Sequence, residues 1–174
     1  GPGWQFLELG RRIERALWVT NLLRQTLVLP EVNEHSVLEA LLEIGDSSMT
    51  YRNRYATNLQ VAPLVDLLVT DETNPRSVAF QLVAVAVHVE HLPQQQAEPV
   101  LAGEQRLAIA LLANVRLADV NRLAEISDSG TRLELERLLG QSASQLCDLA
   151  NAVTRRYLVH AGAAHQMAAI HPGT

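Results

Sequence analysis

The chain contains no lysine, a single cysteine, few aromatic residues and no apolar run of the length that a membrane-spanning helix needs. All fourteen basic residues are arginine, whose planar guanidinium suits bidentate and partly buried pairing better than an ammonium group does. The net charge of −5 argues against a protein that binds nucleic acid through a basic face. Cys147 excludes an intramolecular disulfide and is expected to be a small buried side chain. With no signal peptide at the start, we expect a cytoplasmic location.

The motifs of the common enzyme classes are missing as well. The sequence has no Gly-rich phosphate loop, no Ser-His-Asp order and no Cys-x-x-Cys pair. His88 and His91 are three residues apart, but they lack the His-Glu-x-x-His spacing and a further convergent ligand. We therefore expect no metal, no cofactor and no catalysis by this chain on its own.

The residues that are present favour helices packed on helices. Hydrophobic residues make up 48% of the chain and aromatic residues only 4%, so Leu, Val, Ile and Ala must form the core. Apolar positions recur at spacings of three and four, which is the period of a helix with one buried face. The sequence predicts an all-α fold, an antiparallel bundle of about five to seven helices.

Six helices are expected in one domain that covers residues 1–174. They span residues 4–28, 34–55, 62–69, 75–91, 99–126 and 132–161. Asn74 is the expected N-cap of the fourth helix, with Pro75 at its first position. Gly10 lowers the helix propensity of the first helix, and the close approach of a second backbone would explain it. Residues 1–2 are interpreted as the remnant of a cleaved tag, and residues 162–174 as a flexible tail.

Charged and polar residues interrupt the apolar faces in five short segments, at residues 10–16, 46–48, 51–55, 71–77 and 81–82. An unpaired buried charge costs several kcal/mol, so we expect these segments to meet in one polar cluster. The candidate residues of this cluster are Arg11, Glu14, Arg15, Asp46, Tyr51, Arg52, Arg54, Asp71, Asn74, Arg76 and Ser77.

The expected ion pairs join Glu14 to Arg52 or Arg76, and Arg11 or Arg15 to Asp46 or Asp71. In that arrangement, Glu14→Ala would destabilise the fold by roughly 2–4 kcal/mol, whereas Glu8, expected to be exposed, would contribute little. Three interpretations of the cluster remain open. It is an ion-pair network that fixes helix register, a site for an anion or carboxylate, or a catalytic site.

Residues 3–16 resemble the "G-x-x-F-x-x-L-G-R-x-x-E-R-A" helix of the bacterial alpha-E domain, which is named for its Glu-Arg motif. Residues 51–55 and 71–77 are similar to its "Y-R-x-R-Y" and "D-x-x-N-P-R-S" segments, and Gln81-Leu82 and Leu92-Pro93 fit as well. The resemblance in motifs covers residues 3–93, and the rest of the chain resembles the family only in its helical pattern. Members of this family resemble one another in having two related halves. This chain looks like the C-terminal half, excised from a longer protein.

The resemblance also implies a biochemical setting. The family is found fused to, or encoded beside, a circularly permuted ATP-grasp ligase, often with a transglutaminase-like protease. It implies that this chain is a non-catalytic helical module of an ATP-dependent peptide or amide ligation system, which docks on the ligase or presents substrate to it, in cis or in trans. The alternative is an enzyme whose own site holds Glu14 as general base beside Arg52 and Arg76.

A ligand of the polar cluster would be a peptide or amino acid that carries a carboxylate. Arg52, Arg54 and Arg76 could grip that group bidentately. No nucleic acid or membrane is expected as a partner, and an oligomer remains open.

Overall fold

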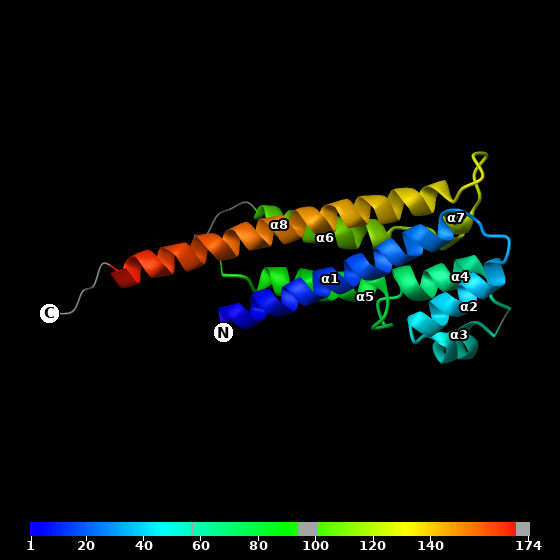
Figure 1. Ribbon diagram of the computed structural model, residues 1–174, viewed down its shortest axis with the longest axis horizontal. Coiled ribbons are helices and arrows are strands. Elements are labelled where there is room, and N and C mark those ends of the chain that lie inside the picture. The colour runs from blue at the N-terminus through cyan, green and yellow to red at the C-terminus, as the bar shows by residue number, and fades with distance from the viewer. Residues whose placement is uncertain (57, 94–100, 170–174) are drawn as a thin grey trace.

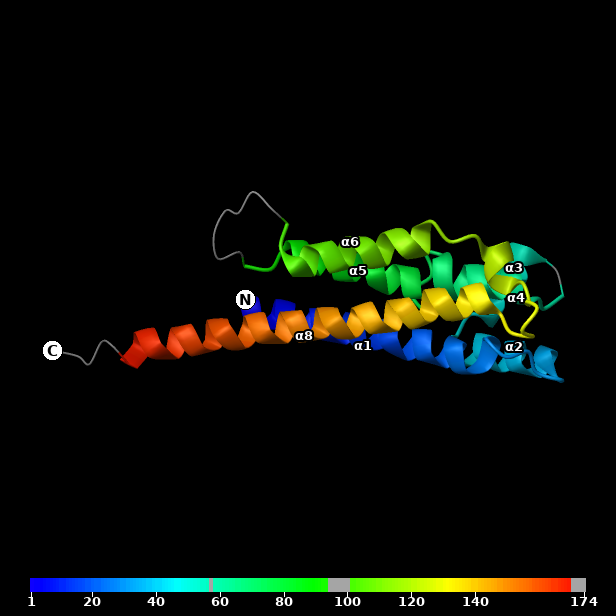
Figure 2. The ribbon, with the colours of Figure 1, turned by 90° about the horizontal axis from the view of Figure 1, so that it is seen from above.

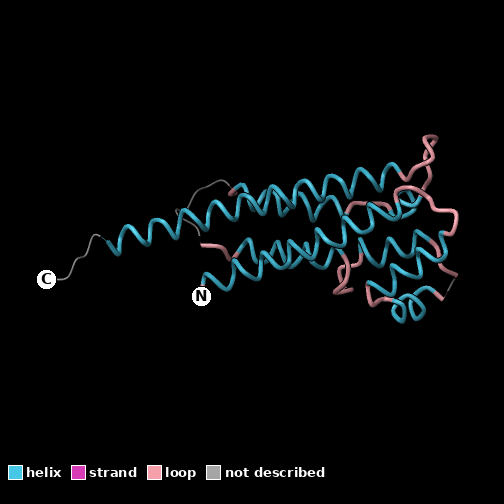
Figure 3. The backbone as a smooth tube through the Cα atoms, in the orientation of Figure 1, coloured by secondary structure: helices cyan, strands magenta, loops and turns pink. Residues whose placement is uncertain are grey.

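The computed structural model describes residues 1–56, 58–93 and 101–169 (Figure 1). In this part of the chain there are eight α-helices, one π-helical segment and no strand. Four longer helices form the body of the bundle: α1 (Pro2–Leu27), α5 (Val78–Glu90), α6 (Gly103–Arg116) and α8 (Leu133–Ala169). The shorter elements gather at one end of the bundle (Figures 1 and 3): α2 (Glu34–Ile44), α3 (Ser48–Tyr55), α4 (Val61–Val65), η1 (Asp66–Thr70) and α7 (Val120–Ala124). The predicted all-α bundle is confirmed.

The first helix shows how the sequence pattern builds the core. α1 packs against α5 and α8, and α6 closes the arrangement by packing against the same two helices. The buried side chains of α1 recur at spacings of three and four, as predicted, and are Leu9, Ile13, Ala16, Thr20, Leu23 and Leu27. Burying one leucine stabilises the folded state by about 1.5–3 kcal/mol, so this stripe holds α1 firmly in the bundle.

Two of the expected helices are broken. Residues 34–55 form α2 and α3 instead of one helix, because Asp46 adopts a left-handed backbone conformation with a φ of 46°. Residues 99–126 are likewise interrupted before α7, where the carboxylate of Asp119 accepts hydrogen bonds from the amides of Asn121 and Arg122 at 2.9 and 3.4 Å. Aspartate competes with helical hydrogen bonding and favours the N-cap, a signal that apolar spacing does not carry. These breaks account for the higher number of helices.

Other boundaries differ too. α5 begins at Val78 and not at Pro75, because the hydroxyl of Ser77 accepts a hydrogen bond from the amide of Phe80 at 3.0 Å and makes Ser77 the N-cap. α8 continues to Ala169, eight residues beyond the expected end at residue 161, and runs past the start of α1 in both views (Figures 1 and 2). Residues 170–174 of the expected tail lie outside the described residues.

Two single-residue expectations are wrong. A Cβ atom placed on Gly10 would meet no atom within 4 Å, so no second backbone approaches there. Cys147 is exposed, because it lies on the outer side of α8. None of the described helices combines the length and hydropathy of a membrane-spanning segment.

Candidate functional site

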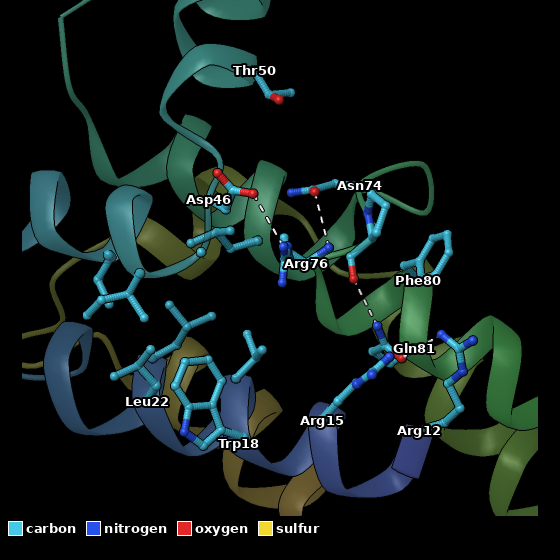
Figure 4. Close-up of a pocket in the computed structure, with 17 residues that line it drawn as sticks. Arg12, Arg15, Trp18, Leu22, Asp46, Thr50, Asn74, Arg76, Phe80 and Gln81 are labelled. Carbon is cyan, nitrogen blue, oxygen red and sulfur yellow. Dashed lines mark hydrogen bonds and ion pairs between the residues drawn. The ribbon is translucent and has the colours of Figure 1, made fainter. Parts of the chain in front are cut away.

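A pocket of about 570 Å³ opens between α1, the turn that joins α2 to α3, and the start of α5 (Figure 4). Leucine side chains line its interior, and two aromatic side chains, Trp18 and Phe80, flank it. The polar residues of the lining are Arg12, Arg15, Asp46, Thr50, Asn74, Arg76 and Gln81. The lining therefore holds three guanidinium groups and one carboxylate. Arg12 pairs with Glu8 and Arg76 with Asp46, so the excess positive charge of the pocket comes from Arg15.

The three arginines of the pocket are held to different degrees. Arg12 donates from Nε to Glu8 at 3.0 Å and from Nη1 to Gln81 at 3.4 Å. Arg76 lies 3.3 Å from the carboxylate of Asp46, but the two side chains are 58% and 82% exposed, so this pair contributes at most about 1 kcal/mol. Arg15 has no hydrogen bond or ion pair among the described residues. Figure 4 shows it extending from α1 toward Gln81. Arg15 and Arg76 are therefore available to a bound anion.

A buried amide fixes the loop that carries Arg76. Asn74 donates from Nδ2 to the hydroxyl of Ser47 at 3.2 Å and to the carbonyl of Leu67 at 3.0 Å. Its Oδ1 accepts a hydrogen bond from the backbone amide of Arg76 at 3.2 Å. Asn74 and Ser47 are buried. The role of Asn74 is therefore to join the α2–α3 turn to the start of the α5 region, and not to cap a helix.

Ser77 and Gln81 complete this support. The buried hydroxyl of Ser77 donates to the carbonyl of Asp71 at 2.5 Å. The amide of Gln81 donates to the carbonyl of Pro75 at 2.9 Å, and this orients its Oε1 toward Arg12. Gln81 lines the pocket and Ser77 lies outside its lining, and the donors of both side chains are used within the protein.

A second polar cluster lies between α3 and η1. Arg54 forms an ion pair with Asp71, whose carboxylate also accepts hydrogen bonds from the amide and hydroxyl of Thr73 at 2.8 and 2.7 Å. Partial burial alone would raise the pKa of Asp71, but the hydrogen bonds from Thr73 and Arg54 outweigh it and lower that pKa. Partial burial, together with a 2.5 Å hydrogen bond to Asp66, raises the pKa of Tyr55 to about 12. These groups pair with one another and do not line the pocket.

Tyr51 is a core residue. It is 1% exposed, and its hydroxyl donates to the carbonyl of Asn58 and accepts from the amide of Gln60, both at 3.1 Å. The side chain therefore ties α3 to the segment that leads into α4.

The expected partners of Glu14 are wrong. Glu14 is exposed and lies in an apolar groove of about 790 Å³ between α1 and α8, whereas Arg76 lines the pocket. Arg52 is exposed and lines neither hollow. Successive residues of a helix are about 100° apart, so Glu14 and Arg15 point to different sides of α1. The catalytic alternative built on Glu14, Arg52 and Arg76 therefore has no shared site.

The remaining expected pairings are also replaced. Residues of four of the five segments, 10–16, 46–48, 71–77 and 81–82, do meet at the pocket. The fifth, residues 51–55, joins them through the ion pair of Arg54 with Asp71. The observed ion pairs are Arg11 with Glu8, Arg12 with Glu8, Arg76 with Asp46, and Arg54 with Asp71. Asp46 and Asp71 thus pair with arginines other than the expected Arg11 or Arg15, and Glu14 has no ion pair among the described residues.

Sequence reasoning missed the most deeply buried arginine. Arg132 is 3% exposed. It donates to both carboxylate oxygens of Glu34 at 3.0 and 2.8 Å, and to the carbonyls of Leu27 and Ala124 at 2.8 and 3.2 Å. The residue therefore links α1, α2, α7 and the start of α8. The position of Arg132 directly before the apolar run of α8 could have indicated a buried arginine. In the same way, Trp18 and Phe80, next to polar segments, could have indicated the pocket.

No group of three or more His, Cys, Asp or Glu side chains among the described residues comes together as a metal site would require.

Comparison with known proteins decides the family. A family model described as a predicted alpha-helical domain with a conserved ER motif, Alpha-E, matches residues 1–158. The chain belongs to the Alpha-E family. Uncharacterized proteins of Mycobacterium tuberculosis and Mycobacterium bovis are 33% identical to it over 162 residues, which are 92% of this chain and 18% of each relative. This Alpha-E chain thus spans less than a fifth of the length of these relatives. No solved structure matches it.

Proposed function

We propose that this Alpha-E chain is a non-catalytic module of an ATP-dependent peptide or amide ligation system. In this role it presents a substrate that carries a carboxylate to a circularly permuted ATP-grasp ligase, in the same chain or in another. The resemblance of residues 3–93 to a family that accompanies such ligases supports the proposal. The relatives, of which the matched segment is only 18%, are long enough to hold further domains.

The observation that carries the proposal is the charge of the pocket. Three arginines and one aspartate line it, and Arg15 has no partner in the described part of the chain. A guanidinium binds a carboxylate through two parallel hydrogen bonds. The leucines and the two aromatic side chains beside it offer apolar contact to the rest of a peptide or amino acid. A carboxylate held at Arg15 and Arg76 would leave the remainder of the substrate directed toward the open side.

A titration with matched ligands tests the pocket. The probe is an N-acetylated dipeptide with one apolar side chain, used as the free acid and as the C-terminal amide. Isothermal titration should show binding of the acid and at least about tenfold weaker binding of the amide, since a charge-assisted pair is worth about 1.5–3 kcal/mol. Arg15→Ala should weaken binding of the acid by a similar factor. Arg106→Ala, which removes an exposed arginine of α6, should leave binding unchanged.

A second measurement tests whether ATP chemistry belongs to the ligase and not to this chain. ATP should bind the isolated chain more weakly than about 100 μM, a free energy near −5.5 kcal/mol. With an ATP-grasp ligase added in trans, this chain should increase peptide-dependent ADP release, and Arg15→Ala should abolish the increase. Tight ATP binding by this chain alone, or equal binding of the acid and the amide, contradicts the proposal.

A further inference from the structure

The outer face of α1 carries an unusual set of exposed side chains. Trp4, Leu7, Arg11, Glu14 and Trp18 follow one another at spacings of three, four, three and four. The three apolar members are 60%, 54% and 55% exposed. We call these five residues the outer stripe. Spacing of this kind places side chains in one line along a helix and is typical of the seam of a coiled coil.

The outer stripe is largely open to solvent, although its neighbours touch its edges. The ring of Trp4 meets that of His88 on α5 with the centroids 6.2 Å apart, Leu7 and Glu14 border the groove between α1 and α8, and Trp18 borders the pocket. The buried side chains of α1, such as Leu9, Ile13 and Ala16, lie on the opposite side of the helix, toward α5 and α8. Figure 2 shows α5 and α6 on one side of α1. A free helix face is normally polar, so two indoles and a leucine in line on this face indicate that it packs against another helix.

The charges at the centre of the stripe are not satisfied within the chain. Glu14 has no ion pair or hydrogen bond among the described residues. Arg11 is more than half exposed and lies 3.7 Å from Glu8, at the limit of an ion pair, while Glu8 is bound more closely by Arg12 at 3.0 Å. The stripe therefore presents one free carboxylate and one loosely held guanidinium, flanked by apolar residues on both sides.

We propose that the outer stripe binds the outer stripe of a second copy of this chain, with the two α1 helices antiparallel. A twofold axis midway between positions 11 and 14 places Arg11 opposite Glu14 of the second copy, and Glu14 opposite Arg11 of the second copy. The same axis places Leu7 opposite Trp18 at each end. Two reciprocal ion pairs are then enclosed by two apolar pairs, which is the self-complementary pattern of a closed twofold interface.

The order of charges selects both the partner and the direction. A parallel arrangement in register would set Arg11 against Arg11 and Glu14 against Glu14, and these like charges would repel. In the antiparallel arrangement every residue of the stripe except Trp4 meets a complementary member of the same stripe. The interface is small, because an aromatic side chain buries only about 150–250 Å² even when fully covered. We therefore expect a reversible dimer with a dissociation constant of about 10–100 μM, weaker than that of a standard interface.

Sedimentation equilibrium of the full chain between about 5 and 500 μM tests this dimer. The wild type should pass from monomer to dimer across this range. Arg11→Glu and Glu14→Arg should each weaken association at least about tenfold, because like charges then face one another across the axis. Arg106→Glu, an exposed charge reversal on α6, should leave the dissociation constant unchanged. Circular dichroism melting of each variant checks that it remains folded.

Mixing the variants gives the decisive result. An equimolar mixture of Arg11→Glu and Glu14→Arg should associate about as tightly as the wild type, because each chain then offers the charges that the other lacks. The double variant that exchanges the two charges should also recover self-association. A wild type that stays monomeric up to 500 μM overturns the proposal. So does a dimer that both single variants leave unchanged, and so does a mixture of the two variants that fails to associate.

Discussion

Arg132 and Arg76 each meet a single carboxylate, but they do so in opposite surroundings. Arg132 lies at the closed end of the bundle, where its side chain is 4% exposed and binds Glu34 and two backbone carbonyls. Arg76 lies at the mouth of the pocket, where its side chain is 58% exposed and contacts Asp46 at 3.3 Å. Both pairs bridge separate elements of the fold.

The two pairs differ in whether water can take the place of the ion-pair partner. The Arg132 side chain is only 4% exposed, so loss of its acceptors leaves a buried charge unpaired, and its removal leaves the carbonyls of Leu27 and Ala124 without this donor. If Arg76 lost Asp46, water would solvate both groups at little cost. An enclosed arginine therefore stabilises the fold, whereas an open one stays free to exchange its partner for a ligand.

Of the substitutions that test this comparison, Arg132→Ala should have the largest effect on stability. It should destabilise the fold by about 3–5 kcal/mol, because Glu34 and the carbonyls of Leu27 and Ala124 all lose their donor. Urea unfolding followed by circular dichroism measures the loss. Arg137→Ala provides the control on the same helix, since that side chain is 66% exposed, and it should change stability by less than about 0.5 kcal/mol. Similar midpoints for the two variants would contradict the structural role of Arg132.

Asn74→Ala and Arg76→Ala sharpen the comparison within one loop. Loss of the Asn74 amide removes the donor to the Ser47 hydroxyl and to the Leu67 carbonyl, and the acceptor of the Arg76 amide, so the fold should lose roughly 2–3 kcal/mol. Arg76→Ala should cost less than about 1 kcal/mol, yet it should weaken binding of the peptide acid. Thermal melting and titration of the same two proteins separate these effects. A stable Asn74→Ala protein would show that the loop does not depend on this amide.

Glu8→Ala and Glu14→Ala give the smallest effects, and they reverse the expectation from the sequence. The Glu8 side chain is 16% exposed and pairs with Arg11 and Arg12, so its loss should cost about 0.5–1 kcal/mol. Glu14 is exposed, and its loss should change stability by less than about 0.5 kcal/mol. The comparison is made by chemical denaturation at a protein concentration well below that of dimer formation. A Glu14→Ala protein that is the less stable of the two would restore the buried network that the sequence suggested.

The candidate site could be predicted only in part. Asn74, Arg76, Ser77, Asp46 and Arg15 do gather at the pocket or directly behind it, as expected of segments that break an apolar pattern. Trp18, Phe80 and Arg12 belong to the same pocket but were not among the candidate residues. A pattern that marks polar interruptions overlooks the aromatic side chains beside them, because those look like ordinary core residues.

The sequence by itself determined the helical class and the buried face of α1, because both follow from the spacing of apolar residues along one helix. It also placed Glu14 and Arg15 next to each other on the first helix. Only the tertiary structure decided which carboxylate meets which arginine. That choice depends on where Asp46 breaks a helix, on how the helices are rotated about their axes, and on which ends meet at Arg132. Each residue is rotated by about 100° about the helix axis from the one before it, so spacing gives the direction in which a side chain leaves its own helix. An ion pair, however, forms only within about 4 Å. Only the packing of separate helices against one another sets that distance.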